Sequence, residues 1–192
     1  MNKNAGYAKR VASLEIEFLK RRLDSFFVTS EVNVSYLSGF KGHDSMLLLT
    51  RENRYFITDS RYVEEARDSL SGFRVVLVEK STYETLSRLI RRDRVKKIGF
   101  ESMNLPCEVS MRLKRGLSGS SLVPIKDLVE TIRAVKDSSE AGSIMASIGL
   151  AKEVLEEIMS IVKPGVQEDS LAKKIEIKLI ERGAKASFEP IV

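Results

Sequence analysis

The sequence predicts an α/β layered fold with a mixed sheet over about residues 1–127. Short apolar runs, which are typical of buried strands, alternate along this part of the chain with longer segments whose apolar residues recur at helical spacing. Such alternation is typical of a sheet covered by helices. The polar turn at 51–54 joins two strand candidates directly, so at least one strand pair is expected to be a hairpin and the sheet to be mixed.

The first half of this domain is expected to open with an amphipathic helix at 6–24, because Val11, Leu14 and Phe18 share one helix face and basic residues occupy the others. After this helix the spacing of the apolar residues becomes that of strands, and helical spacing returns at 60–70, which predicts a second helix. Between these helices, short runs of β-branched and aromatic residues predict strands at 26–29, 45–50 and 55–58.

The second half of the domain begins with an unbroken β-branched run at 73–78, which predicts a strand covered on both faces. Pro106 is tolerated in the first turn of a helix and predicts one that runs to about Leu117, before a flexible turn at 118–121. The remaining elements are expected to be a helix at 82–93 and strands at 97–101 and 122–125.

The last third of the chain differs in pattern. Asp137 and Glu140 have the D-x-x-E spacing of a capping box, which predicts the start of a long helix. A second helix is expected at 168–182, and an apolar strand at 186–192, where the sequence stops. Two helices and one strand cannot bury both of their faces, so this segment is expected to need cover from the first domain or from further chain.

Composition argues against several classes of protein. The 192 residues are 43% hydrophobic, and 32 basic residues are interspersed with 27 acidic ones, so the net charge of +5 does not predict nucleic-acid binding. Cys107 is the single cysteine, which excludes an internal disulfide and suits a reducing compartment. Because no signal peptide or membrane-spanning run is present, no membrane association is expected and the chain is expected to be cytoplasmic.

No motif assigns a catalytic centre. His43 is the only histidine, so the common zinc-binding patterns are incomplete. Asp44 follows it directly, but the chain contains no G-x-S-x-G elbow, so a serine-hydrolase triad is not predicted. A solvated or locally bonded loop histidine is the simpler interpretation. The basic run at 91–97 is interpreted as a solvated helix end, and Cys107 as a structural thiol without a partner histidine. We therefore assign no catalytic residue and no metal ligand.

Two segments nevertheless resemble a known family. The first contains NVSYLSGF at 33–40, a strand pair, and FITDSRY at 56–62. It resembles the amino-terminal domain shared by Xaa-Pro aminopeptidases, prolidases and creatinases, with the pattern N-x-x-Y-L-T/S-G-F followed by D-x-R-Y. The second contains IRAVKD at 132–137, KPGVQE at 163–168 and GAKASFEPIV at 183–192. It is similar to the R-x-x-K-D linker and the opening of the family's catalytic domain.

The resemblance implies a creatinase-like N-terminal three-layer domain at 1–127, a linker at 128–137, and at 138–192 the first two helices and first strand of a pita-bread (α+β) catalytic domain, cut short. In the family, two divalent metal ions (Mn, Co or Zn) are held by residues that follow this strand. The chain is therefore expected to bind no metal and to be inactive alone. The implied parent activity is hydrolysis of Xaa-Pro bonds as an aminopeptidase or dipeptidase, or a creatinase-like amidinohydrolase. The alternative hypothesis is a non-catalytic dimerisation or interaction module.

The resemblance also implies a role for the loop after NVSYLSGF. In the family this domain packs beside the catalytic domain of a neighbouring subunit in a homodimer. Lys41, His43, Asp44 and Arg61 are thus candidate groups for contact with proline-containing peptide substrates or with the partner subunit. Lys41 or Arg61 would meet a carboxylate, and Asp44 an amine or an arginine. A structural alternative stays open for FITDSRY, in which Asp59 or Ser60 caps the following helix and Tyr62 packs under it.

Overall fold

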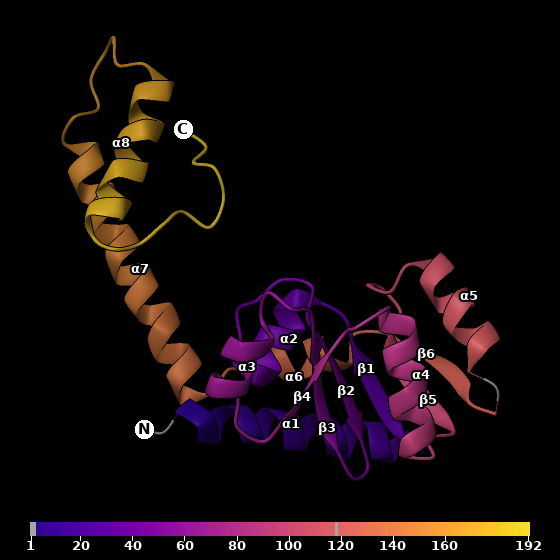
Figure 1. Ribbon diagram of the computed structural model, residues 1–192. Helices are drawn as coiled ribbons and strands as arrows, with labels where there is room; N and C mark the ends of the chain where they lie inside the picture. Colours follow the sequence, from indigo (N-terminus) through magenta and orange to yellow (C-terminus); the bar gives the residue numbers. More distant parts are fainter. Residues whose placement is uncertain (1–2, 118) are drawn as a thin grey trace. The chain divides into compact units, whose positions relative to one another are not determined.

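A six-stranded mixed sheet is the centre of the first of two units in this computed structural model, which describes residues 3–117 and 119–192 (Figure 1). The two units are Met1–Val135 and Lys136–Val192. Across the sheet the strand order is β4-β3-β2-β1-β5-β6. In chain order the strands are β1 (Ser25–Val28), β2 (Met46–Thr50), β3 (Arg54–Thr58), β4 (Arg74–Leu77), β5 (Lys97–Glu101) and β6 (Ser121–Ile125).

The pairing of β1 determines which strand ends meet. β1 pairs antiparallel with β2, with Phe26 opposite Leu49, and parallel with β5, with Phe26 opposite Gly99. β3 is antiparallel to β2 and parallel to β4, and β6 is parallel to β5. Only β2 therefore runs in the reverse direction within this sheet. The ends of β1, β3 and β5 and the start of β2 lie along one border, called here the carboxyl edge.

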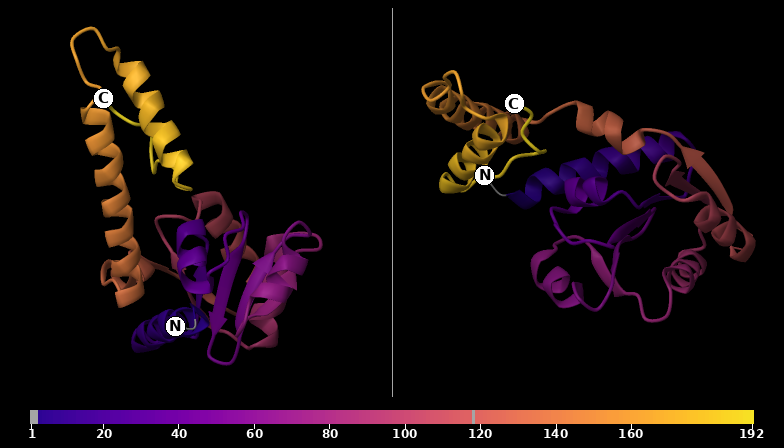
Figure 2. Two further views of the ribbon diagram at one scale, coloured as in Figure 1. Left: turned by 90° about the vertical axis from the view of Figure 1, so that its left-hand side faces the viewer. Right: turned by 90° about the horizontal axis from the view of Figure 1, so that it is seen from above.

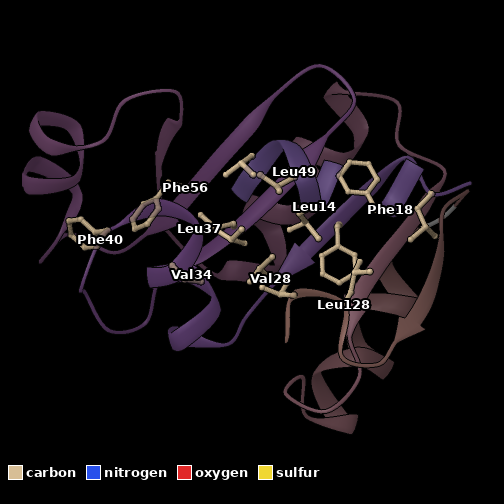
Figure 3. Close-up of a cluster of buried hydrophobic side chains, with 14 of the residues drawn as sticks. Leu14, Phe18, Val28, Val34, Leu37, Phe40, Leu49, Phe56 and Leu128 are labelled. Atoms are coloured by element: carbon tan, nitrogen blue, oxygen red, sulfur yellow. The ribbon is translucent and has the colours of Figure 1, made fainter. Parts of the chain in front are cut away.

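Helices cover both faces of the sheet and give it three layers (Figure 2). Neighbouring side chains of a strand point to opposite faces, so Phe26 packs into one buried cluster and Phe27 into the other. The first cluster joins the sheet to α1, α2, α3 and α6 (Figure 3), and the second joins it to α4 and α5. These helices are α1 (Lys3–Lys20), α2 (Glu31–Ser38), α3 (Val63–Ser69), α4 (Thr82–Arg92), α5 (Cys107–Gly116) and α6 (Leu128–Ala134).

The structure confirms the α/β fold with a mixed sheet, and some of its elements differ from the expectations. The run at 73–78 does not form a strand buried on both faces, because β4 is an edge strand whose residues are only partly buried. α2 was not predicted, since its buried positions include Asn33 and Ser38 and these polar residues interrupt the apolar period. The turn expected at 118–121 begins at a residue outside the described part of the chain.

The second unit consists of α7 (Ser138–Met159) and α8 (Glu168–Glu181), which pack through Val154, Ile158 and Leu171. The capping box is confirmed: the Asp137 carboxylate accepts the Glu140 N–H at 2.9 Å, and the Glu140 carboxylate accepts the Asp137 N–H at 3.0 Å. The strand expected at 186–192 does not form. A strand is stable only when another strand takes up its backbone hydrogen bonds, and this unit supplies none.

No helix among the described residues has both the length and the apolar character needed to cross a bilayer. The longest, α7, carries Glu and Lys side chains among its apolar residues.

Asp93, directly after α4, is a buried carboxylate that three side chains of the β2–β3 hairpin hold in place. Thr50 Oγ1 and Asn53 Nδ2 each donate to Oδ2 at 2.8 Å, and the Tyr55 hydroxyl donates to Oδ1 at 2.9 Å. Burial alone would raise the pKa of Asp93, but these hydrogen bonds stabilise the charged form and hold its pKa below the usual value.

This network is expected to make the fold acid-sensitive. A carboxylate whose pKa is lower in the folded state contributes stability above its unfolded pKa, and that contribution is lost as the pH falls through the folded-state pKa. We expect Asp93→Asn to lower the free energy of unfolding by about 1 to 2 kcal/mol at neutral pH and to flatten its decline below about pH 4. Urea unfolding followed by circular dichroism across this pH range measures both effects. The exposed Asp68→Asn is the control, and wild-type acid dependence in the Asp93 variant would contradict the assignment.

Candidate functional site

The sequence-predicted site residues lie in two loops at the carboxyl edge. The loop at 39–45 leads into the start of β2, and the corner at 59–62 follows the end of β3. Gly39 ends α2 in the left-handed conformation, with φ 80°, and its N–H donates to the Ser35 carbonyl. This cap turns the chain away from the helix and into the first loop. Because β2 starts beside the end of β3, the two loops meet.

Arg61 joins the two loops by pairing with two carboxylates. Its Nη2 lies 2.7 Å from Asp44 Oδ2 and 2.5 Å from Asp59 Oδ2, and its Nε donates to the same Asp59 oxygen at 3.0 Å. The hydrogen bond from Arg61 holds the pKa of Asp59 below its usual value, and the two carboxylates raise the pKa of the Arg61 guanidinium. Two carboxylates share one guanidinium, so this corner carries a net negative charge.

His43 and Asp44 both contact Glu31, in the first turn of α2. His43 Nδ1 lies 3.1 Å from Glu31 Oε2, and the Asp44 backbone N–H donates to Glu31 Oε1 at 3.4 Å. All three residues are exposed. The loop and the first turn of α2 therefore present two carboxylates and an imidazole to solvent at the carboxyl edge.

The structure connects three of the four sequence-predicted residues and leaves the fourth outside the network. His43 and Asp44 are linked through Glu31, and the Asp44 carboxylate accepts a hydrogen bond from Arg61. Lys41 is exposed and makes no ion pair with any residue that the structure describes. Sequence reasoning missed Glu31, because its only signal was a position in the first turn of a helix that was itself not predicted.

Asp59 does not cap α3, so the structural alternative for this residue is wrong in its detail. The helix begins at Val63 with Tyr62 at the N-cap position, and no side chain caps it. The Asp59 carboxylate instead accepts the backbone N–H of Arg61 at 2.8 Å. Tyr62 packs edge-on against Phe40, with ring centroids 6.1 Å apart. Asp59 therefore orients Arg61 rather than starting a helix.

A second polar network, buried behind these loops, anchors the start of α2. Glu101, at the end of β5, is 6% exposed. Its Oε2 accepts the backbone N–H groups of Thr29 and Ser30, each at 2.7 Å, and its Oε1 accepts from Asn33 Nδ2 at 2.6 Å. Sequence reasoning missed Glu101, because a single carboxylate at the end of a strand gives no signal of its distant partners.

Asn33 extends this network to α6 and joins the two motif segments. Its amide nitrogen also donates to Glu130 Oε1 at 2.6 Å, and its Oδ1 accepts from Arg133 Nη1 at 3.0 Å. Tyr36 lies one turn further along α2. The guanidinium carbon of Arg10 is 4.4 Å from the centroid of its ring, and that of Arg133 is 5.9 Å from it. The NVSYLSGF and IRAVKD segments are therefore in direct contact through charged and aromatic groups.

The described residues do not fit a dinuclear metal centre. Within 3–117 and 119–192, no three His, Cys, Asp or Glu side chains lie close enough together to hold a metal ion. The carboxylates of the loop network pair with Arg61 and His43. We therefore derive no chemical step through a metal from this part of the chain.

The chain is similar to known peptidases over about half of their length. It is 29% identical over 171 residues to uncharacterized peptidase YqhT of Bacillus subtilis, covering 88% of this chain and 48% of that protein. An Xaa-Pro dipeptidase structure from Bacillus anthracis matches with a TM-score of 0.86 at 24% identity, over 92% of this chain and 49% of that chain. An X-Pro aminopeptidase structure from Thermotoga maritima gives a TM-score of 0.79 at 25% identity, over 87% of this chain and 49% of that chain.

The first unit, with its six-stranded mixed sheet covered by helices, is an α/β domain, and its fold matches that of these peptidase structures. The chain belongs to the creatinase/prolidase N-terminal domain family, whose model matches residues 10–135. This match confirms the resemblance carried by the NVSYLSGF and FITDSRY motifs and includes α6. The chain spans about half the length of the curated relative and solved structures described above, and it is a relative of Xaa-Pro peptidases over their N-terminal half.

Proposed function

We propose that this chain is the N-terminal part of a proline-specific, metal-dependent exopeptidase that hydrolyses Xaa-Pro peptide bonds. The observation that carries the proposal is the family match at 10–135, combined with coverage of about half of each relative. In this proposal the unit Met1–Val135 serves recognition and assembly, and the unit Lys136–Val192 begins the catalytic domain. The ligands of two divalent metal ions belong to the other half of the enzyme.

Uncovered apolar side chains on the second unit support this division. α7 and α8 bury a small core between them, yet large apolar side chains on their other faces are exposed: Ile144, Met145, Ile148, Leu155, Met159, Ile177 and Ile180. Extended apolar surface of this kind usually marks an interface. A catalytic sheet packed on the two helices would cover it.

The edge loops are the proposed contacts with peptide substrate or with a second protomer of a homodimer. Lys41, His43, Asp44 and Arg61 are exposed at one edge of the sheet, where a partner can reach them. A ligand carboxylate would have to compete with Asp44 and Asp59 for Arg61. Lys41 makes no competing ion pair among the described residues, so it is the more available cation.

The purified 192-residue chain is expected to release no proline-containing product in the presence of Mn²⁺ or Co²⁺, because an activated metal-bound water needs ligands outside it. A chimaera that continues from Val192 into the remaining half of the Bacillus subtilis relative is expected to hydrolyse Xaa-Pro peptides in a chelator-sensitive way. Peptide hydrolysis by both proteins, measured with and without chelator, tests the proposal.

Chelator-sensitive turnover by the 192-residue chain alone would contradict the proposed location of the metal ligands. A folded chimaera without activity would contradict the peptidase proposal and favour a non-catalytic assembly module. Circular dichroism and gel filtration of both proteins identify a failure to fold.

A further inference from the structure

A crevice of about 560 Å³ opens at the carboxyl edge, between the end of β1, the start of β2 and the helices α4 and α5. Pockets that hold small ligands typically have volumes of roughly 300 to 1,000 Å³. The floor of the crevice is apolar and combines side chains from the sheet and from the two helices, namely Phe27, Met46, Leu86, Leu105 and Leu113. A ligand with an apolar group could therefore bury that group here.

The position of the crevice in the sheet is one that α/β proteins often use for binding. β1 and β5 are parallel neighbours, and the chain leaves them toward opposite faces. α2, which follows β1, packs in one buried cluster, whereas α5, which follows β5, covers the other face. At such a point the connecting loops separate and leave a crevice beyond the strand ends, which is the usual ligand site of open α/β sheets.

The charged groups around the crevice have opposite signs on its two sides. Glu31 and Asp44 line it beside β1 and β2, where Asp44 shares a single guanidinium with a second carboxylate. On α5, Glu108 and Arg112 line the crevice, and Glu108 Oε1 lies 4.0 Å from Arg112 and 4.0 Å from Arg115, which stands outside the lining. The loop side of the lining therefore has an excess of negative charge. The two charges of α5 in the lining balance, and Arg115 beside them gives this side an excess of positive charge.

We propose that this crevice binds a short peptide with free termini and a large apolar side chain. The ammonium group would meet Glu31 and Asp44, the carboxylate would meet Arg112, and the apolar side chain would lie on the floor. A zwitterion matches the charge on both sides, whereas a nucleotide or another polyanion would place negative groups beside Glu31 and Asp44. Hydrogen-bonded charged groups at the rim would orient the ligand, and apolar burial would favour its binding.

The crevice lies within residues 27–113, entirely in the first unit, and the proposal concerns binding alone. It does not rest on the proposed peptidase function. A failed activity test would leave it standing, and a failed binding test would leave the activity proposal standing.

Calorimetric titration of the 192-residue chain with the tripeptide Ala-Phe-Ala tests this proposal. We expect saturable binding at one site. Val109 lines the crevice and is 42% exposed, so Val109→Trp fills the space without disturbing the buried core and is expected to weaken binding at least about tenfold. Met111, on the same helix, is 51% exposed and does not line the crevice, so Met111→Trp is the matched control and is expected to bind as the wild type does.

Blocked peptides and charge variants test the assignment of each end. N-acetyl-Ala-Phe-Ala is expected to bind about fivefold more weakly than the free peptide, and Glu31→Gln is expected to abolish that difference. The amide Ala-Phe-Ala-NH₂ is also expected to bind about fivefold more weakly than the free peptide. Arg112→Gln is expected to abolish this difference in binding, and the control Lys114→Gln, at an exposed residue, is expected to retain it.

Absence of saturation up to about 10 mM peptide would overturn the proposal, since a site this weak has no useful affinity. Equal binding by the Val109→Trp and Met111→Trp proteins would overturn the location. Equal binding of free and blocked peptides would overturn the zwitterionic ligand. Circular dichroism and thermal unfolding of each variant show that the binding results come from folded protein.

Discussion

Glu101→Ala is expected to lower the free energy of unfolding by about 4 kcal/mol. Removing this buried carboxylate leaves the backbone N–H groups of Thr29 and Ser30 without their acceptor, and it leaves the Asn33 amide with one of its two carboxylate acceptors, Glu130. A buried donor without a partner costs about 1 to 3 kcal/mol, and partial entry of water reduces the sum. Urea unfolding followed by circular dichroism measures the loss.

Two variants and one local measurement separate this effect from general damage. Glu101→Gln keeps one acceptor oxygen and is expected to lower the free energy of unfolding by about half as much as Glu101→Ala. Glu130 lies on the exposed side of the network, so Glu130→Gln is expected to lower it by about 0.5 kcal/mol. Hydrogen exchange of the Thr29 and Ser30 amides is expected to accelerate in Glu101→Ala. If these two amides stay protected and the stability changes by less than about 1 kcal/mol, the anchoring role of Glu101 is wrong.

Gly39→Ala is expected to destabilise the fold by about 2 to 3 kcal/mol, for two separable reasons. The backbone at Gly39 is left-handed, with φ 80°, which costs a residue with a Cβ about 1 to 2 kcal/mol. An added Cβ would also lie 2.5 Å from Cε2 of the Tyr7 ring, so that ring would have to move. Gly39 is the glycine of NVSYLSGF, and the motif therefore requires glycine for its backbone and for the approach of α1.

The control for Gly39 is another glycine with the same backbone and no neighbour. Gly72 has φ 82° and nothing within 4 Å of an added Cβ. Gly72→Ala therefore reports the conformational cost alone and is expected to lower the free energy of unfolding by about 1 kcal/mol. Tyr7→Ala combined with Gly39→Ala should lower the cost of the glycine replacement to that of Gly72→Ala. Equal losses for the two single glycine variants would show that Tyr7 does not restrict this position.

Both residues act on the candidate site through α2. Glu101 holds the first turn of this helix, Gly39 ends it, and the loop with His43 and Asp44 leaves from that end. Asn33 connects the same helix to Arg133 in α6. The position of the loop at the carboxyl edge therefore depends on buried or partly buried groups that lie outside the loop itself.

Much of the fold was predictable, because it depends on patterns between near neighbours along the chain. The strands β1, β2, β3, β5 and β6 and the helices α1, α4, α7 and α8 follow from apolar periods and turn signals, and each forms close to its expected bounds. The capping box at Asp137 and Glu140 was equally visible, since its partners are three residues apart. The candidate loop was identified only through the family resemblance, and its residues carry no local signal of their partners.

Patterns along the chain were enough to predict the α/β class, the mixed sheet, most of its elements and the family. These depend on side-chain period, turn residues and short motifs, which all act over a few neighbouring residues. Three features became visible only in the folded chain: β4 is an edge strand, Glu101 and Arg133 meet at Asn33, and Arg61 is shared by Asp44 and Asp59. A hydrogen bond or ion pair between residues far apart in the chain forms only after packing brings the two groups within about 3 Å, and no local pattern encodes that approach.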